Sequence, residues 1–255
     1  MRRIEGFPLL VLALSLVGLW LSARIGGFIC GKQRNLEKEE DKDFDVVISA
    51  ILTLLALIIG FSFSMAVNRY DQRKNYEEAE ANAIGTEYVR ADLLPAANGA
   101  RLRTLLKNYL DQRILFYSTS DERKLQQINA CTVQLQADLW SAVNAPVAAQ
   151  PTPAFVLIIS GMNDVLNSQG YTQAAWLYRI PGEAWILMIL IAIICNVMIG
   201  YGSSRPGAKG ALFLVIPLAV SISLFLIADI DSPRHGIIRV QPANLTSLSH
   251  SLRAG

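Results

Sequence analysis

Four long apolar runs, separated by charged or polar segments, dominate the hydrophobic pattern of the sequence. Residues 7–23, 46–67, 184–201 and 211–228 each form a run of about 17 to 22 residues without a charged side chain. A helix rises about 1.5 Å per residue, so about 20 apolar residues are enough to cross a bilayer. The pattern predicts four transmembrane helices.

The second apolar run continues into a charged segment without a Gly or Pro break. Charged residues begin at Arg69 and recur at short intervals as far as Arg90. Ala and Glu, both good helix formers, are frequent in this segment. The pattern predicts one continuous helix that leaves the hydrocarbon near Asn68 and continues into water.

The region between the second and third runs has helical rather than strand periodicity. Apolar residues recur three and four positions apart over 101–116, 125–143 and 154–169. Thr119 and Glu122 have the spacing of a capping box, and 145–153 is a Pro-rich linker. We predict an all-α membrane protein with four transmembrane helices and a cytosolic helical insert between the second and third. The expected segments are 1–67 (first helix pair), 68–182 (insert), 183–229 (second pair) and 230–255 (cytosolic tail).

Composition supports the membrane assignment and argues against other classes. Hydrophobic residues make up 52% and charged residues 17%, with a formal net charge of +2, so nucleic acid is not an expected partner. The three cysteines have no metal-binding spacing, and the charged link at 31–45 lacks the EF-hand pattern. We expect no metal and no cofactor.

No pattern in the sequence indicates catalysis. The two histidines, His235 and His250, both follow the last apolar run, and no phosphate loop, nucleophile elbow or HExxH motif is present. Glu77, Glu80, Glu87 and Asp92 are the other carboxylates that could gather. Glu80 and Glu87 share a helix face, which is expected to be solvated or to form salt bridges between subunits. The sequence therefore predicts a protein that is not an enzyme.

Polar and aromatic residues within the runs, and the charges that flank them, give further expectations. Asn196 is expected to bond a neighbouring helix, and Trp185 and Tyr201 to lie at the membrane interface. Lys and Arg near the span ends favour the side that carries the termini and the insert. These are Arg2, Arg3, Arg69, Arg73, Lys74, Arg179 and Arg234, against Arg24, Lys32, Arg34, Lys38 and Lys42 on the other side. We predict that both termini lie on the inner side of the membrane.

One stripe of the second run consists of small or weakly polar residues three and four positions apart: Ser49, Thr53, Ala56, Gly60 and Ser64. Small residues let membrane helices approach closely, so the stripe is consistent with helix packing. Alternatively, it lines water, with Leu57 and Phe61 beside it forming an apolar constriction. The residues alone leave both interpretations open.

Part of this run resembles the second membrane helix of the bestrophin channels. The similarity lies in Gly60-Phe61, followed by Arg69, Tyr70 and Gln72. The order of two spans, a helical insert and two further spans is also that of bestrophins. The segments EANAIGTEYVRADLLP and DIDSPRHGIIRVQP are similar to those of bacterial bestrophin-like membrane proteins.

The resemblance implies a homopentameric ion channel, with lipid and inorganic ions as its other partners. Its pore would be lined by five copies of the second helix and narrowed at Phe61, Leu57 and Thr53, where Thr53 departs from the apolar pattern. Asn68 and Arg69 would lie at the exit, and Arg69 would favour anions such as chloride if it faced the lumen. Of the acidic run that binds calcium in animal bestrophins, only Asp229 and Asp231 are present, so we expect helix termination and hydrogen bonding there.

Two alternatives to a channel remain at this point. One is a non-conducting membrane scaffold or sensor whose cytosolic helical insert binds a protein partner. The other is an alternating-access transporter, although Pro217 in the fourth run has no counterpart in the second.

Overall fold

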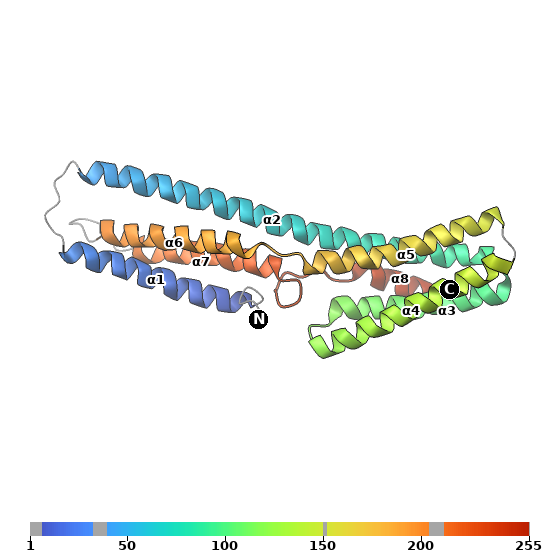
Figure 1. Ribbon diagram of the computed structural model, residues 1–255. Coiled ribbons are helices and arrows are strands. Elements are labelled where there is room, and N and C mark those ends of the chain that lie inside the picture. Colours follow the sequence, from blue (N-terminus) through green and yellow to red (C-terminus); the bar gives the residue numbers. More distant parts are fainter. Residues whose placement is uncertain (1–6, 33–39, 150–151, 204–211, 255) are drawn as a thin grey trace. The chain divides into compact units, whose positions relative to one another are not determined.

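The computed structural model describes residues 7–32, 40–149, 152–203 and 212–254. These residues form helices and connecting turns, with no strand (Figure 1). The helices are α1 (Pro8–Lys32), α2 (Glu40–Arg90), the 3-10 turn η2 (Ala91–Leu93), α3 (Ala96–Ser118), α4 (Glu122–Ala149), α5 (Pro153–Leu177), α6 (Gly182–Ser203), α7 (Leu212–Asp231) and α8 (Ala243–Ala254). The predicted all-α class is confirmed.

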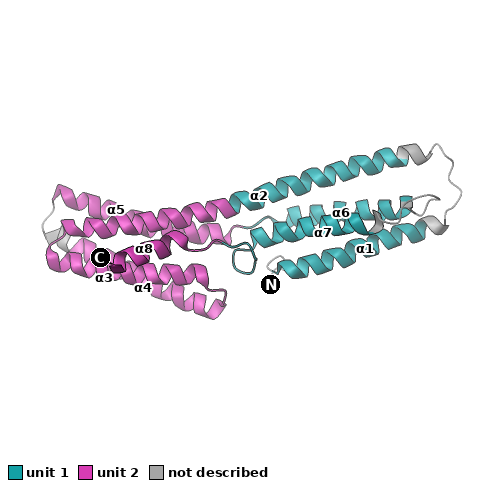
Figure 2. Ribbon diagram, turned by 180° about the vertical axis from the view of Figure 1, so that it is seen from behind, with its two compact units in different colours: residues 1–69, 179–239 teal, residues 70–178, 240–255 magenta. Residues whose placement is uncertain are grey.

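The chain divides into two compact units, coloured separately in Figure 2. Unit 1 comprises residues 1–69 and 179–239, and unit 2 comprises residues 70–178 and 240–255. Helix α2 contributes its first part to unit 1 and its second part to unit 2. Its 51 residues form one helix, as the sequence predicted, with a length of about 76 Å at 1.5 Å per residue.

Unit 1 contains the apolar helices. Among the described residues, four helical stretches are long and apolar enough to cross a membrane, and they include α1, the first part of α2, α6 and α7. Helices α1, α6 and α7 pack against one another. A helix satisfies its own backbone hydrogen bonds, which lipid cannot do, so helical spans are what the apolar runs require.

Two glycines allow α1 and α6 to approach closely. A Cβ at Gly200 would overlap the backbone carbonyl of Ala23, and a Cβ at Gly26 would overlap the carbonyl of Val197. Ala23 is completely buried at this contact. Small residues serve this purpose in membrane helices generally, because they let the backbones meet.

Two buried carboxylates organise the end of α7. Asp231 accepts a hydrogen bond from the backbone N–H of Ile180, with its two oxygens at 3.3 and 3.1 Å. Asp229 accepts the N–H groups of Ile237 and Ile238 at 2.6 and 2.8 Å. Both aspartates therefore fix the chain around a helix end, as expected from the sequence.

Unit 2 is a helical bundle with its own apolar core. Helix α3 packs against α4 and α8, and α4 packs against α5. The core includes the residues that the amphipathic patterns placed on the inner faces of α3, α4 and α5: Leu102, Leu106, Leu110, Ile128, Leu139, Val143, Phe155, Ile158 and Met162. Leu125, Leu135 and Leu166 pack against it while partly buried.

Local details of unit 2 differ from expectation. Asp121, rather than Thr119, caps α4, because its carboxylate accepts the N–H groups of Arg123 and Lys124 at 2.8 and 3.4 Å. The expected linker at 145–153 is shorter, since α4 runs to Ala149 and α5 begins at Pro153. Proline suits the first position of a helix, where no intrahelical N–H bond is lost.

Two other predicted connections are also shorter than expected. Helix α1 continues to Lys32 and α2 begins at Glu40, so both ends of the expected link at 31–45 are helical. The remainder of that link, 33–39, lies outside the described residues. Residues 204–210 of the expected turn between the third and fourth spans also lie outside them, while α6 extends through Ser203.

The contact between α1 and α6 gives a testable prediction. We expect Gly200→Ala to lower the apparent unfolding temperature of the detergent-solubilised protein, because the new methyl group meets a backbone carbonyl that cannot move away. Overpacking of this kind costs about 1–3 kcal/mol. The matched control is Gly18→Ala on α1, where a Cβ meets nothing within 4 Å. Equal behaviour of the two variants would contradict this account of the close packing.

Candidate ion pathway

One face of α2 in unit 1 is not covered by the other described residues of that unit. Two residues along a helix advance by about 200°, so Leu55 lies roughly opposite Leu57. Leu55 is 2% exposed and Leu57 is 52% exposed. The packed side also holds Ser62 and Ala66, whereas the open side holds every residue proposed for the pore except Arg69.

The open face combines the two residue classes that the sequence placed together. Phe61 is 66% exposed, one turn from Leu57, and Thr53 precedes Leu57 by one further turn. A Cβ built at Gly60 meets nothing within 4 Å. Packing within one chain therefore does not explain the small-residue stripe, although packing between copies would leave the same face open.

The polar side chains of the open face include hydroxyl groups that bond within the helix and further side chains nearer the predicted exit. The hydroxyls of Ser49 and Thr53 donate to the carbonyls of Asp45 and Ser49, each at 2.8 Å, so both are satisfied within the helix. Ser64 is also exposed, as is Asn68 at the predicted exit. The face thus carries polar groups along its length and no charge from Ser49 to Asn68.

Arg69 does not lie on the open face. Its position is about a third of a turn from that of Leu57, its side chain is half-buried, and its Nη2 lies 3.8 Å from the sulfur of Met65. The position of Arg69 within a single chain therefore does not support the expectation that it lines the pore exit. The other predicted pore residues share one face.

The second part of α2 carries buried carboxylates, which corrects the expectation that they are solvated. Glu80 is fully buried and pairs with Arg113, while Tyr117 and Thr172 donate hydrogen bonds to Glu80 Oε2 at 3.3 and 3.2 Å. Burial alone would lower the pKa of Arg113, but the adjacent Glu80 carboxylate raises it. This network joins α2, α3 and α5 within unit 2.

Glu77 has a different role in the same unit. Its carboxylate accepts the backbone N–H of Leu245 at 2.9 Å and the side-chain amide of Asn244 at 2.7 Å. An anion is favourable at a helix N-terminus, where free N–H groups concentrate partial positive charge. Glu77 therefore fixes the start of α8 against α2.

Glu87 is buried without a hydrogen bond among the described residues. Neither of its carboxylate oxygens has a hydrogen-bond partner there, and Oε2 forms a longer ion pair with Arg90 Nη1 at 3.8 Å. Burial raises the pKa of Glu87 to about 7, against the lowering influence of Arg90, and Asp164 raises it further. A carboxyl group in such a site takes up a proton near neutral pH.

Two expectations about the third span are also corrected. Asn196 donates to the carbonyl of Ala192 on its own helix at 2.8 Å, rather than to a neighbouring helix. Trp185 is 4% exposed and lies inside unit 1, so it is not an exposed interfacial anchor. Within the described part of the chain, no group of three His, Cys, Asp or Glu side chains could hold a metal ion.

Comparison with known proteins identifies the family. Residues 9–245 match the bestrophin-like domain, which is most of the chain. The chain belongs to the bestrophin-like family. With its four apolar helices, it is an integral membrane protein of that family. No curated protein matches the sequence.

Solved structures of bacterial bestrophin homologues share the fold of this bestrophin-like protein. A Klebsiella pneumoniae homologue with the mutation Y211A aligns with a TM-score of 0.68 at 13% identity, covering 94% of this chain and 97% of that one. The same homologue with the mutation I180T gives 0.69 at 12% identity, covering 95% and 97%. A third structure, obtained by Zn-SAD phasing, gives 0.67 at 13% identity and covers 96% and 97%.

The buried network of unit 2 was missed from the sequence because its signal is divided among distant segments. Glu80, Arg113 and Thr172 lie on three different helices, and no local spacing connects them. The positions of Arg113 and Tyr117 on the apolar face of α3 were the available sign. A charged residue at a core position predicts a buried partner.

Glu87 gives a prediction about pH. Its pKa in the folded protein, about 7, exceeds the ordinary value of 4.5, so the folded state binds the proton more tightly. The stabilising contribution is therefore complete below about pH 4.5 and is lost as the pH rises through 7. It amounts to at most about 3 kcal/mol. Thermal unfolding measured from pH 5 to 8 should show this loss.

Two variants test the assignment to this residue. Glu87→Gln should flatten the pH dependence of the apparent unfolding temperature between pH 5 and 8. Glu78→Gln, which removes an exposed carboxylate from the same helix, should leave it unchanged. If Glu87→Gln retained the pH dependence of the unsubstituted protein, Glu87 would not be the titrating group.

Proposed function

We propose that this bestrophin-like protein is an ion channel whose pore is lined by the open face of α2. The observation that carries the proposal is the face itself, which collects polar and small residues away from the packed side of the helix. Of the four apolar stretches, α2 is the least covered, with 11% of its span buried compared with 22–50% for the others. A pore helix needs such a face to be free.

The contrast with α1 supports water rather than lipid on this face. The exposed side of α1 presents mainly large apolar residues: Leu9, Leu10, Leu14, Val17, Trp20, Leu21 and Ile25. Lipid chains are suited to that surface. The open face of α2 instead interrupts its apolar residues with Ser49, Thr53, Gly60, Ser64 and Asn68, which gain more from water.

The proposed constriction is formed by Phe61 and Leu57, with Thr53 one turn further along. A ring of apolar side chains excludes water from a narrow pore and so stops ions without a physical plug. The hydroxyl of Thr53 already bonds within the helix, so this position weakens the constriction only modestly. The gate therefore rests on two apolar layers.

Five copies of the chain around a common axis are the proposed assembly, following the bestrophin resemblance. A single helix cannot enclose a pore, so the open face of α2 requires partners to complete it. Chloride and other anions are the proposed ions. That choice rests on the family resemblance, because the face between Ser49 and Asn68 is uncharged and Arg69 lies off it.

The competing function is a membrane scaffold or sensor. In that case the open face of α2 would be covered by another subunit, with no continuous water path. Unit 2 has the fixed helical core expected of a docking domain. The conductance measurement below separates the two functions.

The constriction gives the central functional prediction. In planar bilayers, we expect the double variant Leu57→Ala with Phe61→Ala to carry several-fold more current than the unsubstituted protein, since two apolar rings are removed. The matched control is Phe63→Ala, which removes the same ring from a different face of the same helix. Replacing chloride by gluconate then measures whether anions carry the current.

The outcomes of this measurement are distinct. Larger current in the double variant and unchanged current in Phe63→Ala support the proposed constriction. No current from any of the three proteins, with an intact pentamer by native mass spectrometry, would favour the scaffold. A reversal potential insensitive to chloride would refute the proposed anion selectivity while leaving the pore in place.

The proposed orientation, with both termini and unit 2 inside the bacterial inner membrane, has a native reporter. Cys131 on α4 is free and exposed, whereas Cys195 is free and buried. In a Cys30→Ala variant, a membrane-impermeant maleimide should label Cys131 only after intact spheroplasts are permeabilised. Labelling of intact spheroplasts would place unit 2 outside the cell.

A further inference from the structure

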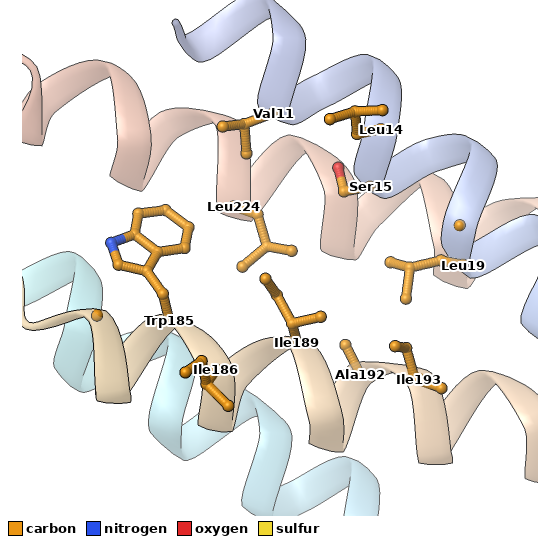
Figure 3. Close-up of a pocket in the computed structure, with 12 residues that line it drawn as sticks. Val11, Leu14, Ser15, Leu19, Trp185, Ile186, Ile189, Ala192, Ile193 and Leu224 are labelled. Carbon is orange, nitrogen blue, oxygen red and sulfur yellow. The ribbon is translucent and has the colours of Figure 1, made fainter. Parts of the chain in front are cut away.

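An apolar cavity of about 450 Å³ lies between α1 and α6 in unit 1 (Figure 3). Trp185 lies at one end of it, and Leu224 reaches toward it from α7. The lining residues are Val11, Leu14, Ser15, Gly18 and Leu19 of α1, Gly182, Trp185, Ile186, Ile189, Ala192 and Ile193 of α6, and Leu224. The cavity is separate from the open face of α2.

The close contact at the other end of the two helices explains why the cavity exists. At Gly26 and Gly200 the backbones of α1 and α6 meet. Toward Val11 and Gly182 the same helices are far enough apart to leave the cavity. Gly18 adds to the hollow, since a Cβ there meets nothing within 4 Å. The groove therefore follows from helices that touch at one end and diverge at the other.

The chemistry of the lining selects an apolar occupant. Ser15 is the one polar side chain in it apart from the Trp185 indole, and its hydroxyl already donates to the carbonyl of Leu12 at 3.1 Å. The ring nitrogen of Trp185 lies on the side away from Leu224 and Ile189 (Figure 3). A bound water needs two to four polar partners, which this cavity does not offer. An empty groove would forfeit dispersion contacts along its whole lining.

The length and shape of the cavity suit a flexible hydrocarbon chain. The lining of α1 runs from Val11 to Leu19, a rise of about 12 Å. A hydrocarbon chain has no fixed backbone geometry, so it can follow a space of this length between two diverging helices.

We propose that this cavity binds one acyl chain of a membrane phospholipid. The occupant is available because α1, α6 and α7 are membrane helices, whose exposed apolar surface is in contact with lipid. The bound chain fills the space between the diverging ends of α1 and α6 and contacts the carbon edge of Trp185. This site does not depend on ion conduction and would exist equally in a scaffold.

Brominated phosphatidylcholine tests the proposal, because bromine on an acyl chain quenches a tryptophan that it contacts. The protein would be reconstituted in vesicles of this lipid as the full chain, in a Trp20→Phe background that removes the exposed tryptophan of α1. Subtracting the signal of a further Trp185→Phe variant isolates Trp185. Since Trp185 is only 4% exposed, we expect strong quenching only if a chain enters the cavity.

Substitutions that fill the cavity with a larger side chain test whether an acyl chain occupies it. Gly18→Leu, and independently Ser15→Leu, should reduce the quenching of Trp185 at least twofold. Ala13→Leu is the matched control, since Ala13 is exposed on the same helix but does not line this cavity. It should leave the quenching unchanged.

Two results would overturn the proposal. One is absence of Trp185 quenching in the Trp20→Phe protein, which would mean that a neighbouring subunit or collapse of the helices closes the groove. The other is equal quenching in the cavity-filling variants and in Ala13→Leu, which would mean that lipid reaches Trp185 by another route. Bilayer current plays no part in either readout, so the outcome is independent of the proposed channel.

Discussion

The unbroken course of α2 is the constraint on which the rest of the structure depends. In hydrocarbon no water can satisfy a free backbone N–H or C=O, so the helix cannot break within its span. Instead it continues for several turns past the first charged residue, Arg69, and ends at Arg90. The first part of α2 belongs to unit 1 and its second part to unit 2.

The polar residues of α2 lie mainly on its exposed face in unit 1 and on its buried face in unit 2. In unit 1 its packed face is nearly apolar, and its polar residues lie on the open face. In unit 2 its packed face carries Glu77, Glu80 and Glu87, each buried but each in a different environment. Glu77 caps α8, Glu80 is paired with Arg113, and Glu87 lacks a hydrogen bond. Removing one partner of a buried pair is costly, so the pair of Glu80 and Arg113 holds α3 against α2.

The helix that carries the proposed constriction is also part of unit 2. A rotation or shift imposed on α2 by α3, α5 or α8 acts on the same helix that carries Leu57 and Phe61. In the proposed channel, a small rotation of α2 would exchange an apolar ring for Gly60 and Ser64 at the proposed constriction. Protonation of Glu87 near neutral pH is one event in unit 2 that changes the charge of α2 itself.

The sequence by itself determined the helical class, the four apolar spans, the continuity of α2 and the inner faces of α3, α4 and α5. These follow from periodicity and from the length of apolar runs, which are local properties of the chain. Only the tertiary structure decided that Glu80 and Glu87 are buried, that Asp121 rather than Thr119 caps α4, and that Trp185 lines a cavity. The burial of Glu80, Glu87 and Trp185 depends on which distant segment covers a given face, and spacing along one helix carries no information about that.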